Sequence, residues 1–127
     1  MLSQSKLQSI VWTSRIKDAE RFYRDVLGLR LQGQSHGALV FEVGQGELRV
    51  SPVPGTQPSP HTVLGFSVQD ATSVIDTLSS RGVVFERFAG FPHLPNGAIV
   101  TSEGALVAWF RDPDGNLLSV VQYRAEA

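Results

Sequence analysis

The stretch from Asp18 to Leu29, DAERFYRDVLGL, spaces its apolar residues as one face of a helix does. Asp18 belongs to the residue types that cap helix N-termini, and Gly28 tolerates the left-handed conformation that follows many last turns. The stretch therefore predicts a helix over residues 18–28. Its apolar stripe must be buried, so we expect this helix to pack on a sheet.

The helical pattern recurs 52 positions later, where Asp70 takes the place of Asp18. Arg81-Gly82 closes this second helix. Strand-like runs flank both helices, with turn residues between them. The runs cover residues 9–16, 29–31, 38–43 and 47–53 in the first half, and residues 62–68, 83–88, 98–101, 105–110 and 117–123 in the second. Each half thus contains a strand, a helix and further strands, which predicts an α+β fold of two βαβββ modules.

The segment between the halves is rich in proline, with four proline residues from Pro52 to Pro60. Proline cannot donate to a strand ladder, so this segment is typical of a linker. A chain of 127 residues is long enough for one domain with a sizeable core. We therefore predict a single domain over residues 1–127, with module one at about 5–53, a linker at 54–60 and module two at about 61–124.

The composition excludes several classes of function. Eleven basic and twelve acidic residues give a net charge of −1 without a basic patch, so we expect neither nucleic acid nor a membrane surface as a partner. The chain has no cysteine, which excludes disulfides, thiolate zinc sites and cysteine nucleophiles. The N-terminal residues lack the pattern of a signal peptide, so a cytoplasmic location is expected.

The phrase WFRDPDGNLL, from Trp109 to Leu118, resembles the F-x-D-P-D-G-N turn of the vicinal-oxygen-chelate superfamily, which unites glyoxalases, bleomycin-resistance proteins and dioxygenases. The stretch from Asp18 to Leu29 resembles the first helix of that family, and Arg81-Gly82-Val83 resembles the end of its second helix. The resemblance implies a cupped mixed sheet with the helices on its convex side. These residues identify a fold rather than a chemistry, because the family contains lyases, isomerases, dioxygenases, transferases and drug-sequestering proteins.

Metal-dependent members of the family carry His, Gln or Glu ligands at fixed strand positions. The resemblance places two of these positions seven residues before the aspartate that opens each helix, at Val11 and Val63. A third lies three residues after the asparagine of the turn, at Ser119, where glutamate is usual, and the fourth lies around residues 49–51. Valine does not bind divalent ions, and the three histidines are not closely paired. We therefore predict no metal site and no cofactor.

Strand alternation, counted from the two valines, predicts which side chains line the cup. The predicted ligand-binding residues are Val11, Thr13, Arg15, Glu42, Arg49, Val63, Gly65, Trp109, Ser119 and Val121. Trp109 would stack on a planar ligand, with ordinary half-buried packing as the alternative. Arg15 and Arg49 would receive an anionic group, unless they point to solvent as most strand-edge arginines do. Glu42 would be a general base if it is buried.

The sequence therefore favours a metal-free protein that binds a small organic molecule in the cup. The alternative is an enzyme of the lyase, isomerase or dioxygenase type that uses Glu42, His61 or an unconventional metal site. A purely structural role is a third reading. We also expect a homodimer, because sheet edges and the apolar loop at residues 89–97 need cover. That loop would serve as a lid or as an interface.

Overall fold

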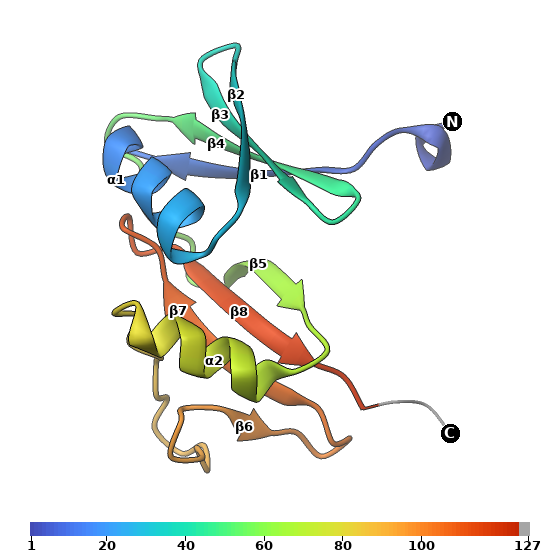
Figure 1. The fold of residues 1–127 in the computed structure, drawn as a ribbon, viewed down its shortest axis with the longest axis vertical. Coiled ribbons are helices and arrows are strands. Elements are labelled where there is room, and N and C mark those ends of the chain that lie inside the picture. The colour runs from blue at the N-terminus through green and yellow to red at the C-terminus, as the bar shows by residue number, and fades with distance from the viewer. Residues whose placement is uncertain (125–127) are drawn as a thin grey trace. The chain divides into compact units, whose positions relative to one another are not determined.

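In the computed structural model, which describes residues 1–124, the chain forms two compact units, Met1–Gln57 and Pro58–Ala127. Each unit has its own four-stranded mixed sheet and one longer helical segment that packs on it, as Figure 1 shows. The prediction of an α+β fold built from two βαβββ modules is confirmed. Within residues 1–124, no helix is long and apolar enough to cross a membrane.

The first unit begins with a short 3-10 helix, η1 (Leu2–Gln4), and continues into the βαβββ order. Its elements are β1 (Gln8–Thr13), α1 (Ile16–Arg21), the π-helix η2 (Phe22–Val26), β2 (Arg30–Ser35), β3 (Ala38–Val43) and β4 (Gly46–Pro52). The strand order is β1-β4-β3-β2, with β1 parallel to β4 and the other pairs antiparallel. Strand β1 therefore lies at one edge of this sheet.

The core of the first unit lies between the helical segment and one face of the sheet. Tyr23 is fully buried, and its ring lies 6.0 Å from the ring of Phe41. The strand residues on the same face are buried as well; they are Val11, Thr13, Leu39, Leu48 and Val50. Burial of such side chains contributes about 1.5–3 kcal/mol each, so this face holds the helix on the sheet.

The first helix begins earlier than the sequence predicted. Its N-cap is Arg15 rather than Asp18, and the Ala19 amide already donates to the Arg15 carbonyl over 2.8 Å. Asp18 instead lies in the first turn, where its negative charge interacts favourably with the helix dipole and with Arg21 at 3.2 Å. The predicted end is confirmed, because Gly28 has a φ of 72°.

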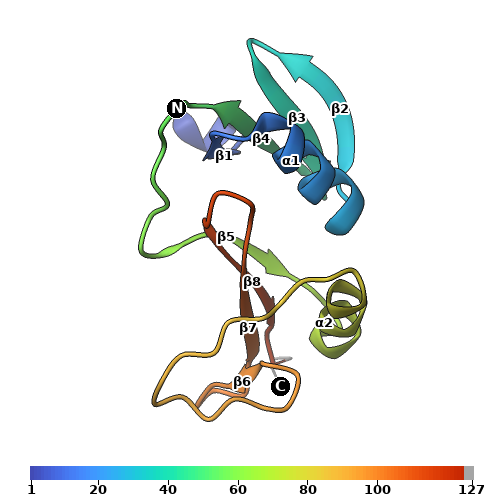
Figure 2. The same ribbon diagram turned by 90° about the vertical axis from the view of Figure 1, so that its left-hand side faces the viewer.

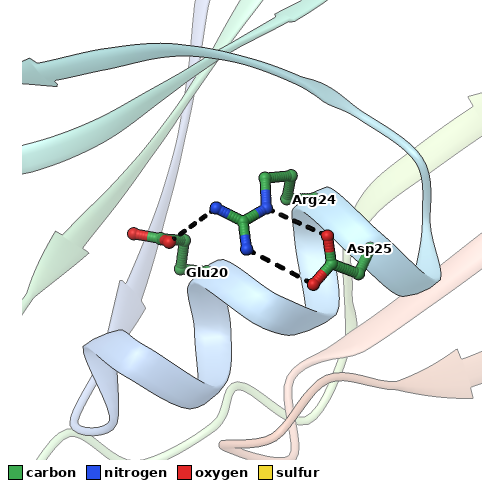
Figure 3. A network of polar contacts seen from close by, with 3 residues as sticks. All are labelled: Glu20, Arg24 and Asp25. Atoms are coloured by element: carbon green, nitrogen blue, oxygen red, sulfur yellow. Dashed lines mark hydrogen bonds and ion pairs between the residues drawn. The ribbon is translucent and has the colours of Figure 1, made fainter.

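The exposed side of this helical segment carries a small ionic network, drawn in Figure 3. The Arg24 guanidinium donates to Asp25 (Nε–Oδ1 2.9 Å) and to Glu20 (Nη1–Oε2 2.9 Å). The hydrogen bond from Arg24 is the largest cause that lowers the pKa of Asp25 below its ordinary value, and the same contact raises the pKa of Arg24. These groups are exposed, so the network affects titration more than stability.

The second unit contains β5 (Thr62–Ser67), α2 (Ala71–Ser80), β6 (Ile99–Val100), β7 (Leu106–Arg111) and β8 (Leu117–Gln122), in the strand order β5-β8-β7-β6. Asp70 caps α2 as predicted, since its carboxylate accepts from the Ser73 amide over 3.1 Å. The helix buries Ile75 and Leu78, and Phe110 is fully buried in β7. The Phe110 ring meets Phe85 edge-on, with centroids 5.6 Å apart.

The strand predicted over residues 83–88 is absent. Residues 83–98 form an irregular connection from α2 to β6, seen at the lower left of Figure 2. One backbone bond, from the Glu86 amide to the Trp109 carbonyl (2.7 Å), ties this segment to β7, and Glu86 also pairs with Arg111. The chain then turns away from β7 at residues 89–90, where the Phe91 amide donates to the Phe88 carbonyl over 3.2 Å and Gly90 has a φ of 87°.

The turn between β7 and β8 is held by a buried aspartate. Both Asp112 and Asn116 are less than 10% exposed, at 6% and 7%. The Asp112 carboxylate accepts from the amides of Asp114 (3.0 Å) and Asn116 (2.9 Å), and from the Asn116 side chain (2.9 Å). These bonds hold the turn in one conformation, which determines the register of β7 with β8 and therefore the face of the sheet to which each side chain points.

Candidate functional site

A large hollow lies on the open face of the second unit's sheet, opposite α2. Its volume is about 1040 Å³. The apolar and aromatic lining consists of Ala105, Val107, Trp109, Val121 and Tyr123. The hydroxyl-bearing lining consists of Thr62, Ser67, Thr101, Ser102 and Ser119, and Gly65, Glu103 and Arg124 complete the wall. This mixture of apolar surface and few charges is typical of a site for a small organic molecule.

The strand register arranges part of this lining in rows. Gly65, Ser119 and Trp109 lie side by side on β5, β8 and β7. Ser67, Val121 and Val107 form the next row. Because adjacent strands lie about 4.8 Å apart, each row is roughly 10 Å wide. The four predicted residues Gly65, Trp109, Ser119 and Val121 are therefore brought together on one face.

The indole of Trp109 is half-buried and is supported from the loop before β6. Its ring meets the ring of Phe88 edge-on, with centroids 5.4 Å apart and an interplanar angle of 76°. Phe88 is held in turn by His93, whose Nε2 accepts from the Phe88 amide (2.9 Å), while its Nδ1 bonds the Gly97 carbonyl (2.6 Å). His93 is thus a structural bridge within the loop.

Val63 does not line the hollow, although the sequence predicted that it would. The pairing of β5 with β8 shifts register between Thr62 and Leu64, so Val63 lies at an irregularity. A bulge changes the phase of alternation, and Thr62 lines the hollow together with Gly65 although they lie three positions apart. His61, which precedes β5, is exposed and is not part of the lining.

The orientation predicted for β1 is wrong by one residue. Val11 and Thr13 are 3% and 1% exposed and lie on the core face, whereas Trp12 is 55% exposed. The prediction counted from Asp18, but the helix is capped by Arg15, an odd number of residues earlier. Side chains alternate with a period of two, so an odd error exchanges the two faces of the strand.

Arg15 lies beyond the end of β1, at the N-cap of α1, so strand alternation does not apply to it. Glu42 is exposed and accepts from Gln32 (3.3 Å), so the burial on which its role as a general base depended is not met. Arg49 does face the open side of its sheet, where it donates to the Ser35 carbonyl over 2.6 Å. It lines a smaller hollow of about 230 Å³ together with Gln34.

The donor set does not fit a catalytic divalent ion. Among residues 1–124, no group of three or more His, Cys, Asp or Glu side chains lies close enough to hold a metal. The family's first ligand position lies seven residues before the start of the first helix. Because that helix is capped by Arg15, the position falls on Gln8, whose side-chain amide donates to Glu47 over 2.5 Å. The second module offers only Val63 and the neutral hydroxyl of Ser119, and such a set lacks the ligands that a divalent ion prefers.

Several lining residues were missed from the sequence for identifiable reasons. Val107 and Tyr123 share the alternation of Trp109 and Ser119, so extending the count along β7 and β8 would have found them. Glu103 and Arg124 lie outside the strands, on the turn before β7 and after the end of β8. Their proximity depends on tertiary structure, which periodicity does not contain.

Comparison with known proteins shows the family and the fold. A family model of the Glyoxalase/Bleomycin resistance protein/Dioxygenase superfamily matches residues 6–120, and the chain belongs to that superfamily. No curated protein sequence matches the chain.

Solved structures share the fold. A putative glyoxalase family protein from Bacillus anthracis is 16% identical, with a TM-score of 0.74 over 95% of this chain and 96% of that one. A bleomycin resistance determinant encoded on the transposon Tn5 is 21% identical, with a TM-score of 0.71 over 96% and 100% of the chains. Lactoylglutathione lyase from Agrobacterium tumefaciens is 20% identical, with a TM-score of 0.67 over 94% and 93%. At these identities the similarity shows the fold alone.

Proposed function

We propose that this protein binds a small, largely apolar organic molecule in the hollow of the second unit, without a metal ion. The observation that carries the proposal is the lining of that hollow, where an indole and two valines lie beside serine and threonine hydroxyls. Such a surface gains free energy from burying a flat apolar molecule, and its hydroxyls orient it.

Trp109 is the residue on which this proposal depends most. We expect Trp109→Ala to weaken binding of planar aromatic compounds by about 1–3 kcal/mol, since the indole is the largest apolar surface in the hollow. Trp12→Ala is the matched control, because Trp12 is the only other tryptophan and lies in the first unit. A thermal-shift screen of planar aromatics, followed by equilibrium dialysis of the hits, measures both variants. Equal losses in the two variants, or no hits, would contradict the proposal.

The absence of a metal is a separate part of the proposal, supported by Val63 and Ser119 at positions where the family carries ligands. Protein purified without chelators should contain zinc, nickel, iron and manganese only in substoichiometric amounts by elemental analysis. A stoichiometric ion whose removal abolishes ligand binding would refute this part and leave the hollow as a metal-assisted site.

We also propose that the protein forms a homodimer. The support is apolar surface along the edge strand of the first unit, where Ile10 and Trp12 are more than half exposed, beside the exposed Leu7. Light scattering at micromolar concentration should give twice the mass of one chain. The mass of a single chain would contradict this part of the proposal.

A further inference from the structure

One hydroxyl that lines the hollow, on the largely buried residue Ser119, is available to a ligand. Ser119 is 8% exposed, and its side chain makes no hydrogen bond within the described residues. No fully buried side-chain oxygen or nitrogen in residues 1–124 lacks a partner, so the Ser119 Oγ opens into the hollow. A hydroxyl at such a place has a donor and an acceptor available to a ligand.

The neighbour of Ser119 on β5 leaves space in front of that hydroxyl. Gly65 pairs with Ser119, and a Cβ added at Gly65 would lie 3.2 Å from the Ser119 Oγ. The position does not need glycine for its backbone, because Gly65 lies outside the set of glycines with positive φ. The missing side chain therefore leaves a flat patch of backbone between the strand edge and the hydroxyl.

The other neighbour of Ser119 in the same row is Trp109. A flat ring placed in this row would lie beside the indole and over the bare backbone of Gly65, with its edge toward the Ser119 Oγ. Aromatic pairs prefer offset or edge-on contacts of this kind. A ring atom that accepts a hydrogen bond, such as a ring nitrogen, occupies no more space than the carbon it replaces. A bulky substituent on the ring would instead collide with the backbone of β5.

We propose that Gly65 and Ser119 form a slot that selects a flat aromatic ligand with a hydrogen-bond acceptor in its ring plane, such as an unprotonated ring nitrogen, and that the Ser119 hydroxyl donates to this atom. The inference rests on the proposed function of the same hollow. Gly65 determines whether a ring fits, and Ser119 distinguishes a heteroaromatic ring from a hydrocarbon of the same shape.

Quinoline and naphthalene test the inference, because they share one shape and differ by a ring nitrogen. Equilibrium dialysis at neutral or mildly basic pH gives the Kd of each probe for the wild type and for Ser119→Ala. We expect Ser119→Ala to weaken quinoline binding about three- to tenfold, as a lost neutral hydrogen bond does, and to leave naphthalene unchanged. Ser79→Ala is the matched control, because it removes an exposed hydroxyl of α2 that lies outside the lining of the hollow, and it should change neither Kd.

Gly65→Ala supplies a second test that removes no hydrogen bond. The added methyl group fills the slot and should weaken both probes on the order of tenfold. Circular dichroism should show an unchanged fold, because the contact is with one small side chain.

The outcomes separate the two proposals. If Ser119→Ala changes the two probes equally while Trp109→Ala weakens both, the hollow binds aromatics and the selective slot is wrong. If Gly65→Ala leaves both Kd values unchanged, the ring does not lie over Gly65 and the slot is also wrong. If the wild type binds neither probe, the proposed function fails together with this inference.

Discussion

The two units repeat one βαβββ order, yet the open faces of their sheets differ in character. In the second unit this face is a hollow of about 1040 Å³ with apolar walls and an indole. In the first unit it holds a hollow of about 230 Å³ whose lining includes the polar side chains of Gln32, Gln34, Glu47 and Arg49. Arg49 donates to the Ser35 carbonyl, and Glu47 accepts from Gln8. The core faces of both units are alike, with one large aromatic side chain fully buried in each sheet.

This comparison shows that the repeat preserves the helix-facing side of each sheet, while the open side is free to vary. A buried face must match the helix that covers it, and a mismatch there costs several kcal/mol. An open face has no such partner within its unit. Binding surface in this fold is therefore to be sought among residues that the packing does not need.

Phe110 and Trp109 test the contrast most strongly, since they are adjacent residues on opposite faces of β7. Phe110→Ala should destabilise the fold by about 3–5 kcal/mol, because the ring is fully buried and leaves a cavity. Trp109→Ala should cost clearly less stability, because the indole is half-buried over an open hollow. Urea unfolding of both variants gives the two free energies. A larger loss for Trp109→Ala would reverse the two faces of this strand.

The corresponding pair in the first unit is Val11 and Trp12. Val11→Ala should destabilise the fold by about 2 kcal/mol, since it removes buried methyl groups from the core face. Trp12→Ala should have a smaller effect on unfolding although it removes many more atoms, because this side chain is 55% exposed. The same urea titrations apply. If the order of the two losses is opposite, β1 has the orientation that the sequence predicted.

The contrast between Val11 and Gly65 also shows how far the sequence determines the site. Asp70 caps α2, so counting back from it places Gly65 on the open face correctly. Asp18 looks like an equivalent cap but lies inside the first turn, and the count from it exchanged the faces of β1. Periodicity predicts that a strand has two different faces, but the choice between them depends on the true start of the neighbouring helix.

Two other features could not be predicted from the periodicity of the sequence, for a different reason. Residues 83–88 have strand-like composition, but they make only one backbone hydrogen bond to β7, from the Glu86 amide. Strand β7 pairs with β6 instead, through residues 106–107. The bulge at Val63 is likewise a property of the pairing with β8. Both depend on which strand lies alongside, which is tertiary information.

The smallest expected effect concerns the exposed faces of the two helices. In the first unit Arg24 lowers the pKa of Asp25 by a hydrogen bond, whereas Asp76 on α2 has no ion-pair partner within residues 1–124. A lowered pKa in the folded state means that the charged carboxylate stabilises the fold. This stabilisation is present above the ordinary carboxyl pKa of about 4 and is lost as the pH falls through the lower, folded value.

Asp25→Asn should therefore be slightly less stable than the wild type near neutral pH, and the difference should vanish in acid as the wild-type carboxylate is protonated. Asp76→Asn is the matched control, because it removes an exposed helical carboxylate without an ion pair to lose. Urea unfolding at several pH values measures the two variants, and an NMR titration of the Asp25 carboxyl measures its pKa directly. In Arg24→Gln the pKa of Asp25 should rise toward the ordinary value. If it does not move, Arg21, the other cation that acts on Asp25, holds the carboxylate charged, and the network of Figure 3 is not the cause of the shift.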